Sequence, residues 1–215
     1  MAASNNVELE FFGAAREVTG SCHILRVGGR TVLLDCGLFQ GRRQETREKN
    51  LRLPIPPDRI DAVVLSHAHI DHAGRLPLLV ADGYRGQVHC TPATRDLCAV
   101  MLVDAAHLQE KDAEYLARHG KPFAAPLYQQ RDVATLMKQM HVTPYGETFE
   151  PTPGVRVTFV DAGHILGSAS VVIDCTENGR TTRLVFSGDV GRKGLPIIRD
   201  PEPPNGADAV ILEST

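Results

Sequence analysis

One short segment, residues 66–74 with the sequence Ser-His-Ala-His-Ile-Asp-His-Ala-Gly, constrains this chain more than any other feature. Within six residues it offers four side chains with metal-binding atoms: His67, His69, Asp71 and His72. The segment follows residues 60–65, an apolar run that predicts a buried strand. Imidazole nitrogens and carboxylate oxygens both bind Zn²⁺ at about 2.0–2.2 Å, and a tight turn leaving a rigid strand aims several of them at one point. The segment therefore predicts a metal site, and a polar turn that caps a helix is the weaker alternative.

Two later segments end in the same manner. Residues 155–161 predict a strand that is followed by His164, and residues 183–186 predict a strand that is followed by Asp189. Each side chain alone is more typical of a turn, but together with the first segment they form a ligand set. We expect one metal to bind His67, His69, His164 and Asp189. A second metal would use Asp71 and His72, with Asp189 as the bridging ligand.

Asp35 closes another predicted strand, residues 31–35. An acid at that place can accept a hydrogen bond from the free N–H of a metal-binding histidine and thereby fix its tautomer. An aspartate that caps a helix or a turn is the alternative interpretation.

The order of predicted elements is β-rich, then helical, then β-rich again. Strands are expected at residues 7–12, 22–27, 31–35, 60–65, 87–90, 155–161, 170–174, 183–186 and 208–213, with a Gly28-Gly29 turn. Helices are expected to start at residue 74, to run over residues 94–118, and to run over residues 132–140. This order predicts an α/β sandwich in which helices cover packed sheets.

Composition excludes several classes of protein. The chain has 215 residues and a net charge of −3, so RNA would have to be engaged by a local basic patch. Its apolar runs are far shorter than the roughly 20 residues of a membrane helix, so no membrane partner is expected. The five cysteines form no Cys-x-x-Cys pair, which favours a reducing cytoplasm over a disulfide framework. Oligomeric state is left open, a homodimer included.

The ordered motifs resemble a known family. Leu34-Asp-Cys-Gly, the histidine segment at 67–72, Gly163-His164 and Ser187-Gly-Asp189 are similar to the metal motifs of the metallo-β-lactamase fold. Residues 12–21 (Phe-Gly-Ala-Ala-Arg-Glu-Val-Thr-Gly-Ser) and 34–41 resemble its RNA-processing branch with an inserted β-CASP domain. That branch includes the endonuclease subunit of the pre-mRNA cleavage and polyadenylation machinery and its bacterial and archaeal relatives.

The resemblance implies an αββα four-layer sandwich that is incomplete at the C-terminus. Residues 1–215 would be the lactamase-like domain, with the β-CASP domain and the remaining lactamase elements after residue 215. The chain also stops directly after an apolar run at residues 210–212, which itself suggests a fragment. The final Leu-Glu-Ser-Thr resembles the start of the β-CASP domain, where the acid, here Glu213, pairs with a histidine of that domain.

The implied chemistry is phosphodiester hydrolysis. Two divalent ions about 3.5–4 Å apart hold a hydroxide and clamp a phosphate between them. Asp71 or Asp189 would steer the nucleophile, and Glu213 completes the catalytic set that the resemblance implies. Histidine with carboxylate suits zinc best, and manganese is the alternative metal.

Candidate substrate contacts are fewer. Arg16, in the loop after the first strand, and Arg192 and Lys193, just after Asp189, are placed to touch a phosphate. The basic stretch at residues 42–52 alternates with Glu45 and Glu48, so a solvated helix face is the better interpretation. The remaining histidines are expected to serve packing or the surface: His23, His89, His107, His119 and His141.

We carry three hypotheses. The first is a metal-dependent endo- or 5′-exoribonuclease. The second keeps the fold and changes the substrate to a thioester or lactone, as in glyoxalase-II-like enzymes, because many hydrolases share the segment at 67–72. The third is a non-catalytic subunit that binds RNA or protein, and the intact set of metal motifs argues against it.

Overall fold

The computed structural model describes residues 7–120 and 125–214, except for the side chains of residues 43 and 44. These residues form two sheets. Sheet A has the order β1-β2-β3-β4-β5-β6. Its strands are β1 (Glu8–Gly13), β2 (Cys22–Val27), β3 (Arg30–Leu34), β4 (Ala62–Val64), β5 (Gln87–Cys90) and β6 (Met140–Val142). Neighbouring strands are antiparallel from β1 to β3 and parallel from β3 to β6.

Sheet B has the order β11-β10-β9-β8-β7. Its strands are β7 (Thr148–Thr152), β8 (Val155–Asp161), β9 (Ala169–Glu177), β10 (Arg180–Phe186) and β11 (Ala209–Ile211). The pairs from β7 to β10 are antiparallel, and β11 joins β10 in parallel. β11 therefore lies at an edge of the sheet.

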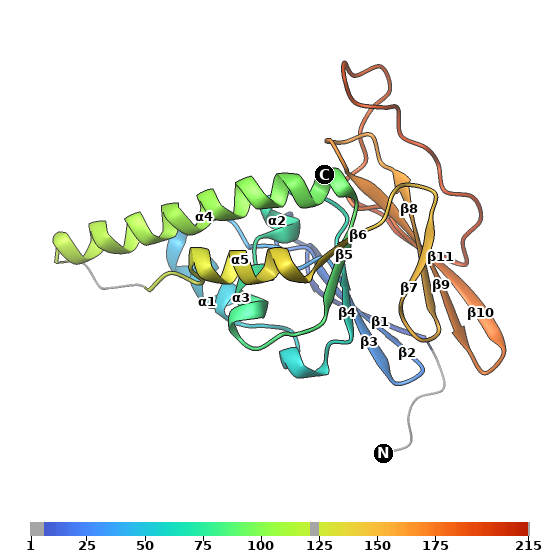
Figure 1. The fold of residues 1–215 in the computed structure, drawn as a ribbon, viewed down its shortest axis with the longest axis horizontal. Helices are drawn as coiled ribbons and strands as arrows, with labels where there is room; N and C mark the ends of the chain where they lie inside the picture. The colour runs from blue at the N-terminus through green and yellow to red at the C-terminus, as the bar shows by residue number, and fades with distance from the viewer. Residues whose placement is uncertain (1–6, 121–124, 215) are drawn as a thin grey trace.

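The helices lie on the outer face of sheet A, and sheet B packs against its other face (Figure 1). They are α1 (Arg43–Leu51), the 3₁₀ turn η1 (Pro57–Arg59), α2 (Ile70–Ala73), α3 (Leu76–Ala81), α4 (Pro92–Arg118) and α5 (Gln130–Gln139). The expected α/β sandwich is thus confirmed. Among the described residues, the helix layer and both sheets are present, and no helix lies on the outer face of sheet B.

Two cores follow from the alternation of side chains along the strands. In β3, Leu33 points to the helices, whereas Val32 and Leu34 point to sheet B. The inter-sheet core is completed by apolar residues of β8 to β10, among them Val157, Phe159 and Ile173. Because successive strand side chains face opposite sides, sheet A is buried on both faces and its strand ends are held firmly.

The structure corrects several expected boundaries. The helix expected to start at residue 74 begins at Ile70 as α2, stops, and restarts as α3. Pro77 lies in the first turn of α3, where its missing N–H is tolerated, but it cannot continue α2. The strand expected at 208–213 is only β11, and it is an exposed edge rather than a core strand, with Val210 57% exposed. α1 forms within the basic stretch that was interpreted as a helix face, whereas β6 and β7 were not expected.

No helix within the described ranges combines the length and apolar character that crossing a membrane requires.

Candidate metal centre

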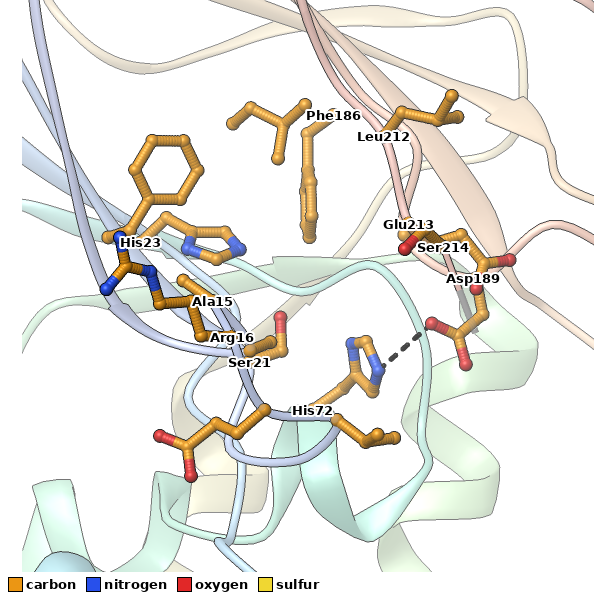
Figure 2. A pocket seen from close by; sticks show the side chains of 16 residues that line it. Ala15, Arg16, Ser21, His23, His72, Phe186, Asp189, Leu212, Glu213 and Ser214 are labelled. Carbon is orange, nitrogen blue, oxygen red and sulfur yellow. Dashed lines mark ion pairs between the residues drawn. The ribbon is translucent and has the colours of Figure 1, made fainter.

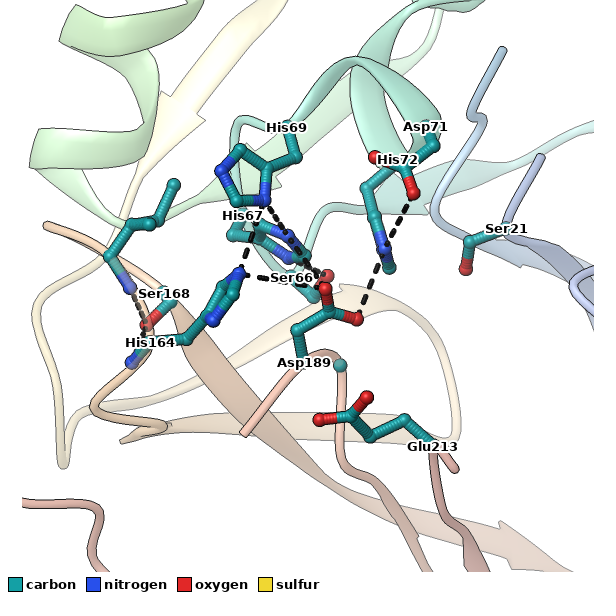
Figure 3. A network of polar contacts seen from close by, with 12 residues as sticks. Ser21, Ser66, His67, His69, Asp71, His72, His164, Ser168, Asp189 and Glu213 are labelled. Carbon is teal, nitrogen blue, oxygen red and sulfur yellow. Dashed lines mark hydrogen bonds and ion pairs between the residues drawn. The ribbon is translucent and has the colours of Figure 1, made fainter. Parts of the chain in front are cut away.

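Four side chains from three strand ends converge at one point (Figure 3). His67 and His69 follow β4, His164 follows β8, and Asp189 follows β10; one ligand atom from each lies within 4.8 Å of the others. His69 Nδ1 lies 3.2 Å from His67 Nε2 and 3.1 Å from His164 Nε2. Asp189 Oδ2 lies 3.7 Å and 3.5 Å from the same two Nε2 atoms.

The proton positions in this cluster fit a cation. Ser66 Oγ donates to Asp35 Oδ2 at 2.9 Å and lies 3.0 Å from His67 Nδ1, so Nδ1–H donates to Ser66 and Nε2 keeps a lone pair. His69 Nδ1 can donate a proton to only one of the two Nε2 atoms beside it. At least one of the two contacts therefore lacks a well-aligned hydrogen bond, and a shared metal ion would satisfy the nitrogens of both.

Burial keeps the imidazoles of His67 and His69 neutral, as metal binding requires. His67 is fully buried, and burial together with the neighbouring His72 lowers its pKa to about 2. The pKa of His69 is lowered by burial and by His164. The buried strand β4 supplies this environment, because each of its residues is fully buried.

A second group lies on the other side of Asp189. His72 Nε2 is 3.2 Å from Asp189 Oδ1 and 3.9 Å from Asp71 Oδ2. Asp189 thus presents one carboxylate oxygen to each group, the arrangement of a bridging ligand. Asp71 and His72 lie at this position because α2 begins at Ile70, directly after the strand-end loop.

Asp35 holds this second group in place. Its buried carboxylate lies 2.7 Å from His72 Nδ1 and accepts hydrogen bonds from Ser66 N–H at 2.7 Å and from Ser21 Oγ at 3.1 Å. Its φ of +60° is unusual for a residue other than glycine and aims the side chain beneath α2. His72 Nδ1–H therefore points to Asp35, which leaves Nε2 for a ligand.

Charge at this position favours a cation. Burial lowers the pKa of His72, but the charge of Asp35 and the hydrogen bond with Asp189 outweigh it and raise that pKa to about 10. Burial raises the pKa of Asp189, but the hydrogen bond and charge of His72 hold it at about 2. The two carboxylates thus favour positive charge at His72 Nε2, whether it comes from a proton or from a metal ion.

Glu213 supports the loop that carries Asp189. Val190 N–H donates to Glu213 Oε1 at 2.7 Å, and Glu213 N–H donates to Ser187 Oγ at 3.0 Å. Glu213 also lines the cavity beside Asp189 and His72 (Figure 2). The catalytic role expected for it stays a prediction.

The structure separates the candidate substrate contacts. Arg16 lines the cavity that opens beside His72 and Asp189 (Figure 2). Lys193 lines a different groove, next to Val185, and Arg192 is exposed. The basic stretch does form helix α1, in which Lys49 pairs with Glu17 at 2.6 Å.

His23 was assigned to packing or the surface, and its ring does pack against Phe11 and Phe186. It lines the same cavity as Arg16 and is 3% exposed. A signal was present: His23 shares a strand face with Leu25 and Val27, which belong to the inter-sheet core. A polar side chain at the end of an apolar strand face, close to the predicted metal ligands, is unusual.

A helix-covered sheet packed on a second sheet, with histidines and an aspartate converging at the strand ends, defines an α/β sandwich with a candidate metal centre between its sheets. The family model described as the metallo-beta-lactamase superfamily matches residues 15–213. The chain therefore belongs to the metallo-β-lactamase superfamily.

Curated relatives are longer than this chain. Ribonuclease TTHA0252 of Thermus thermophilus is 42% identical over 95% of this chain and 42% of its own length. The transcription termination factor FttA of Methanosarcina mazei is 37% identical over 76% of this chain and 24% of its own length. The chain thus spans less than half the length of these relatives.

Solved structures agree on the fold. The Rm3 metallo-β-lactamase has a TM-score of 0.51 at 22% identity, with 87% of this chain and 62% of that chain covered. A metallo-β-lactamase variant of Cronobacter sakazakii has a TM-score of 0.51 at 20% identity, with 88% and 63% covered. At these identities the likeness shows the fold alone.

Proposed function

We propose that this chain is the lactamase-like part of a metal-dependent hydrolase that cleaves RNA phosphodiester bonds. The observation that carries the proposal is the pair of ligand groups joined by Asp189, which fits two cations side by side. The relatives named as a ribonuclease and as a transcription termination factor favour RNA as the substrate.

The candidate ligands would form two neighbouring cation sites. His67, His69, His164 and Asp189 would hold one ion, and Asp71, His72 and Asp189 the other. When bound, the two ions supply Lewis acidity and a nucleophile that exists at neutral pH. Asp71 is placed to orient the attacking group, and Asp35 keeps His72 in the tautomer that the second position requires.

The finer assignments are part of the same proposal. Zinc suits the mixed histidine and carboxylate donors, with manganese as the alternative. Membership in the β-CASP branch is supported by residues 12–21 and 34–41 and by Glu213, which fit its motifs. The domain assignment of residues 1–215, a cytoplasmic location and a homodimer stay predictions.

The test is the variant His69→Ala of the intact protein. His69 lies between both Nε2 atoms of the first group, so its loss opens that position, while its half-buried ring contributes little to the core. We expect cleavage of single-stranded RNA to be abolished, bound metal to fall, and the circular dichroism spectrum to stay the same.

His107→Ala, an exposed change on α4, is the matched control and should cleave like wild type. Undiminished cleavage by His69→Ala would remove the proposal. Turnover of S-lactoylglutathione without RNA cleavage would favour a thioester hydrolase instead. Metal binding without turnover of either substrate would favour a non-catalytic subunit.

A further inference from the structure

A cavity of about 410 Å³ opens next to the second ligand group (Figure 2), within the range of about 300–1,000 Å³ that small-molecule sites occupy. His72 and Asp189 lie at one end of it. His23 and Phe186 line the other end (Figure 2), and the ring of Phe11, which also lines the cavity, packs against that of His23. The cavity therefore continues from the place where a phosphate would be cleaved to a wall made of aromatic rings.

The ring of His23 is held between two phenylalanines. Its centroid lies 5.0 Å from that of Phe11 and 5.4 Å from that of Phe186, both edge to face. Its Nδ1 is buried and has no hydrogen-bond partner among the described residues. An N–H at that atom would be left without an acceptor, so the proton belongs on Nε2, the ring nitrogen that remains for a ligand.

His23 is suited to an uncharged group. Burial lowers its pKa, so the ring is neutral near pH 7 and adds no positive charge to attract a phosphate. Arg16, on the rim of the same cavity, supplies charge instead, and its φ of +64° is a strained conformation for a residue with a Cβ. The cavity thus combines a charged rim with an uncharged aromatic interior.

We propose that this cavity binds the nucleobase next to the scissile phosphodiester, with Phe11 and Phe186 as apolar walls and His23 Nε2–H as the donor to the base edge. The inference rests on the proposed RNA hydrolase function. A base fits because it is flat and aromatic and carries hydrogen-bond acceptors on its edge; proteins recognise unpaired bases by such ring contacts and edge contacts. His23 is then a specificity-determining residue and does not perform the chemistry.

The test compares the RNA affinity of wild type and two variants under conditions in which the RNA is not cleaved. Anisotropy of a labelled single-stranded RNA is measured in EDTA for wild type, His23→Phe and His23→Gln. Phe keeps the ring between its neighbours and removes the donor, whereas Gln carries an N–H close to the place of Nε2. We expect His23→Phe to weaken binding about tenfold, the size of one lost hydrogen bond, and His23→Gln to stay within about twofold of wild type.

The partner of His23 is located with abasic RNAs. An abasic nucleotide is moved one position at a time across the cleavage site, and one position should weaken wild-type binding about tenfold. With the abasic nucleotide at that position, His23→Phe should lower the affinity no further. The acceptor on the base is already absent, so removing the donor has no additional effect. His107→Phe is the matched control and should bind every RNA like wild type.

The outcomes separate this inference from the function on which it rests. Suppose that metal-loaded wild type cleaves RNA, but His23→Phe lowers the affinity for intact and abasic RNAs equally, or lowers neither affinity. The proposed base-binding cavity is then wrong, and the proposed hydrolase function stands. If wild type binds no RNA, the inference fails as well. Should His23→Phe not fold, the abasic scan on wild type and the His23→Gln variant still decide it.

Discussion

Single side chains fix the geometry of the metal centre through their hydrogen bonds. The carboxylate of Asp35 is the hub, because it contacts His72 directly and His67 through the hydroxyl of Ser66. One buried acid therefore sets the tautomer of a histidine in each ligand group. Such partners are typically worth 10–100-fold in metal affinity or activity.

Asp35→Asn tests this role. The amide has nearly the same shape but replaces one acceptor oxygen with a donor, which then faces the N–H and O–H donors around it. We expect metal affinity and RNA cleavage to fall about 10–100-fold, with an unchanged circular dichroism spectrum. Metal titration measures the effect. Ser21→Ala, which removes one donor to Asp35, should cost far less; equal affinity of Asp35→Asn and wild type would contradict the prediction.

The sequence predicted which residues converge, but not every residue of the cavity. The segment at 67–72 was informative because metal-ligand types are rarely so dense at a strand end. For His23 the sequence offered only its place on the apolar face of β2, which does not show that it lines a cavity. Its place depends on the packing of β2 against Phe186, more than 160 residues further along the chain, and no short pattern encodes that contact.

At the scale of elements, loops that pass close to one another fix the positions of the candidate ligands. A Cβ on Gly37 would overlap the backbone carbonyl of Asp71, and a Cβ on Gly191 would overlap that of Gly163, 2.7 Å from His164 N. A Cβ on Gly188 would lie 2.9 Å from Ser66 Cβ. Each ligand loop is thus crossed by a segment that only glycine allows.

Gly191→Ala should disturb the His164 loop. The added methyl group meets backbone, which cannot swing away as a side chain can, so His164 must move from the first ligand group. We expect metal content and cleavage to fall sharply and stability to fall by about 1–3 kcal/mol, as for overpacked sites. Metal analysis and denaturant unfolding measure the two effects.

Gly194→Ala is the matched control, because its Cβ meets nothing within 4 Å although its φ is +76°. It should lose a little stability through backbone strain and keep its metal. If Gly191→Ala binds metal like this control, the crossing does not position His164.

Sequence patterns predicted the elements with a clear apolar signal better than those without one. Strands β2, β5 and β8 have the expected bounds, and most of their side chains are buried. β7 was missed because Pro151 argues against a strand, and it is tolerated there since β7 lies at a sheet edge. β6 has three residues, of which two are exposed, so it lacks the apolar signal.

For the whole molecule, the metal centre bridges the two sheets. His67, His69 and His72 follow β4 of sheet A, whereas His164 and Asp189 follow β8 and β10 of sheet B. Metal binding should therefore couple the sheets and stabilise the fold. An ion that binds only the folded state adds about 2.7 kcal/mol to the free energy of unfolding when its free concentration is 100 times its Kd.

Metal removal is thus expected to lower the Tm. EDTA should lower it in wild type, and added Zn²⁺ should restore it. His164→Ala, which removes a ligand from sheet B, should show a much smaller shift between the two conditions. Calorimetry of the four samples measures this. A metal-dependent shift in His164→Ala as large as that of wild type would show that the ion does not join the sheets.

Acid stability also depends on a histidine that is not one of the candidate metal ligands. His89 on β5 is 4% exposed and stacks on Phe149 of β7, and neither of its ring nitrogens has a hydrogen-bond partner within the described part of the chain. Burial, with a smaller contribution from the neighbouring His141, lowers its pKa from 6.5 to about 4. Folded His89 is therefore neutral where the unfolded chain already binds a proton.

The sign of the pH dependence follows from this difference. Well above pH 6.5, His89 is neutral in both the folded and the unfolded state, so it adds no pH dependence. As the pH falls from 6.5 to 4, mainly the unfolded state gains a proton at His89. The free energy of unfolding therefore falls by about 3 kcal/mol. His89→Phe keeps an aromatic ring against Phe149. Between pH 7 and pH 4.5 its free energy of unfolding should fall by about 2–3 kcal/mol less than that of wild type. Urea unfolding in EDTA at both values measures it, with exposed His107→Phe as the control. Equal losses in His89→Phe and wild type would mean that His89 is protonated in the fold at pH 4.5.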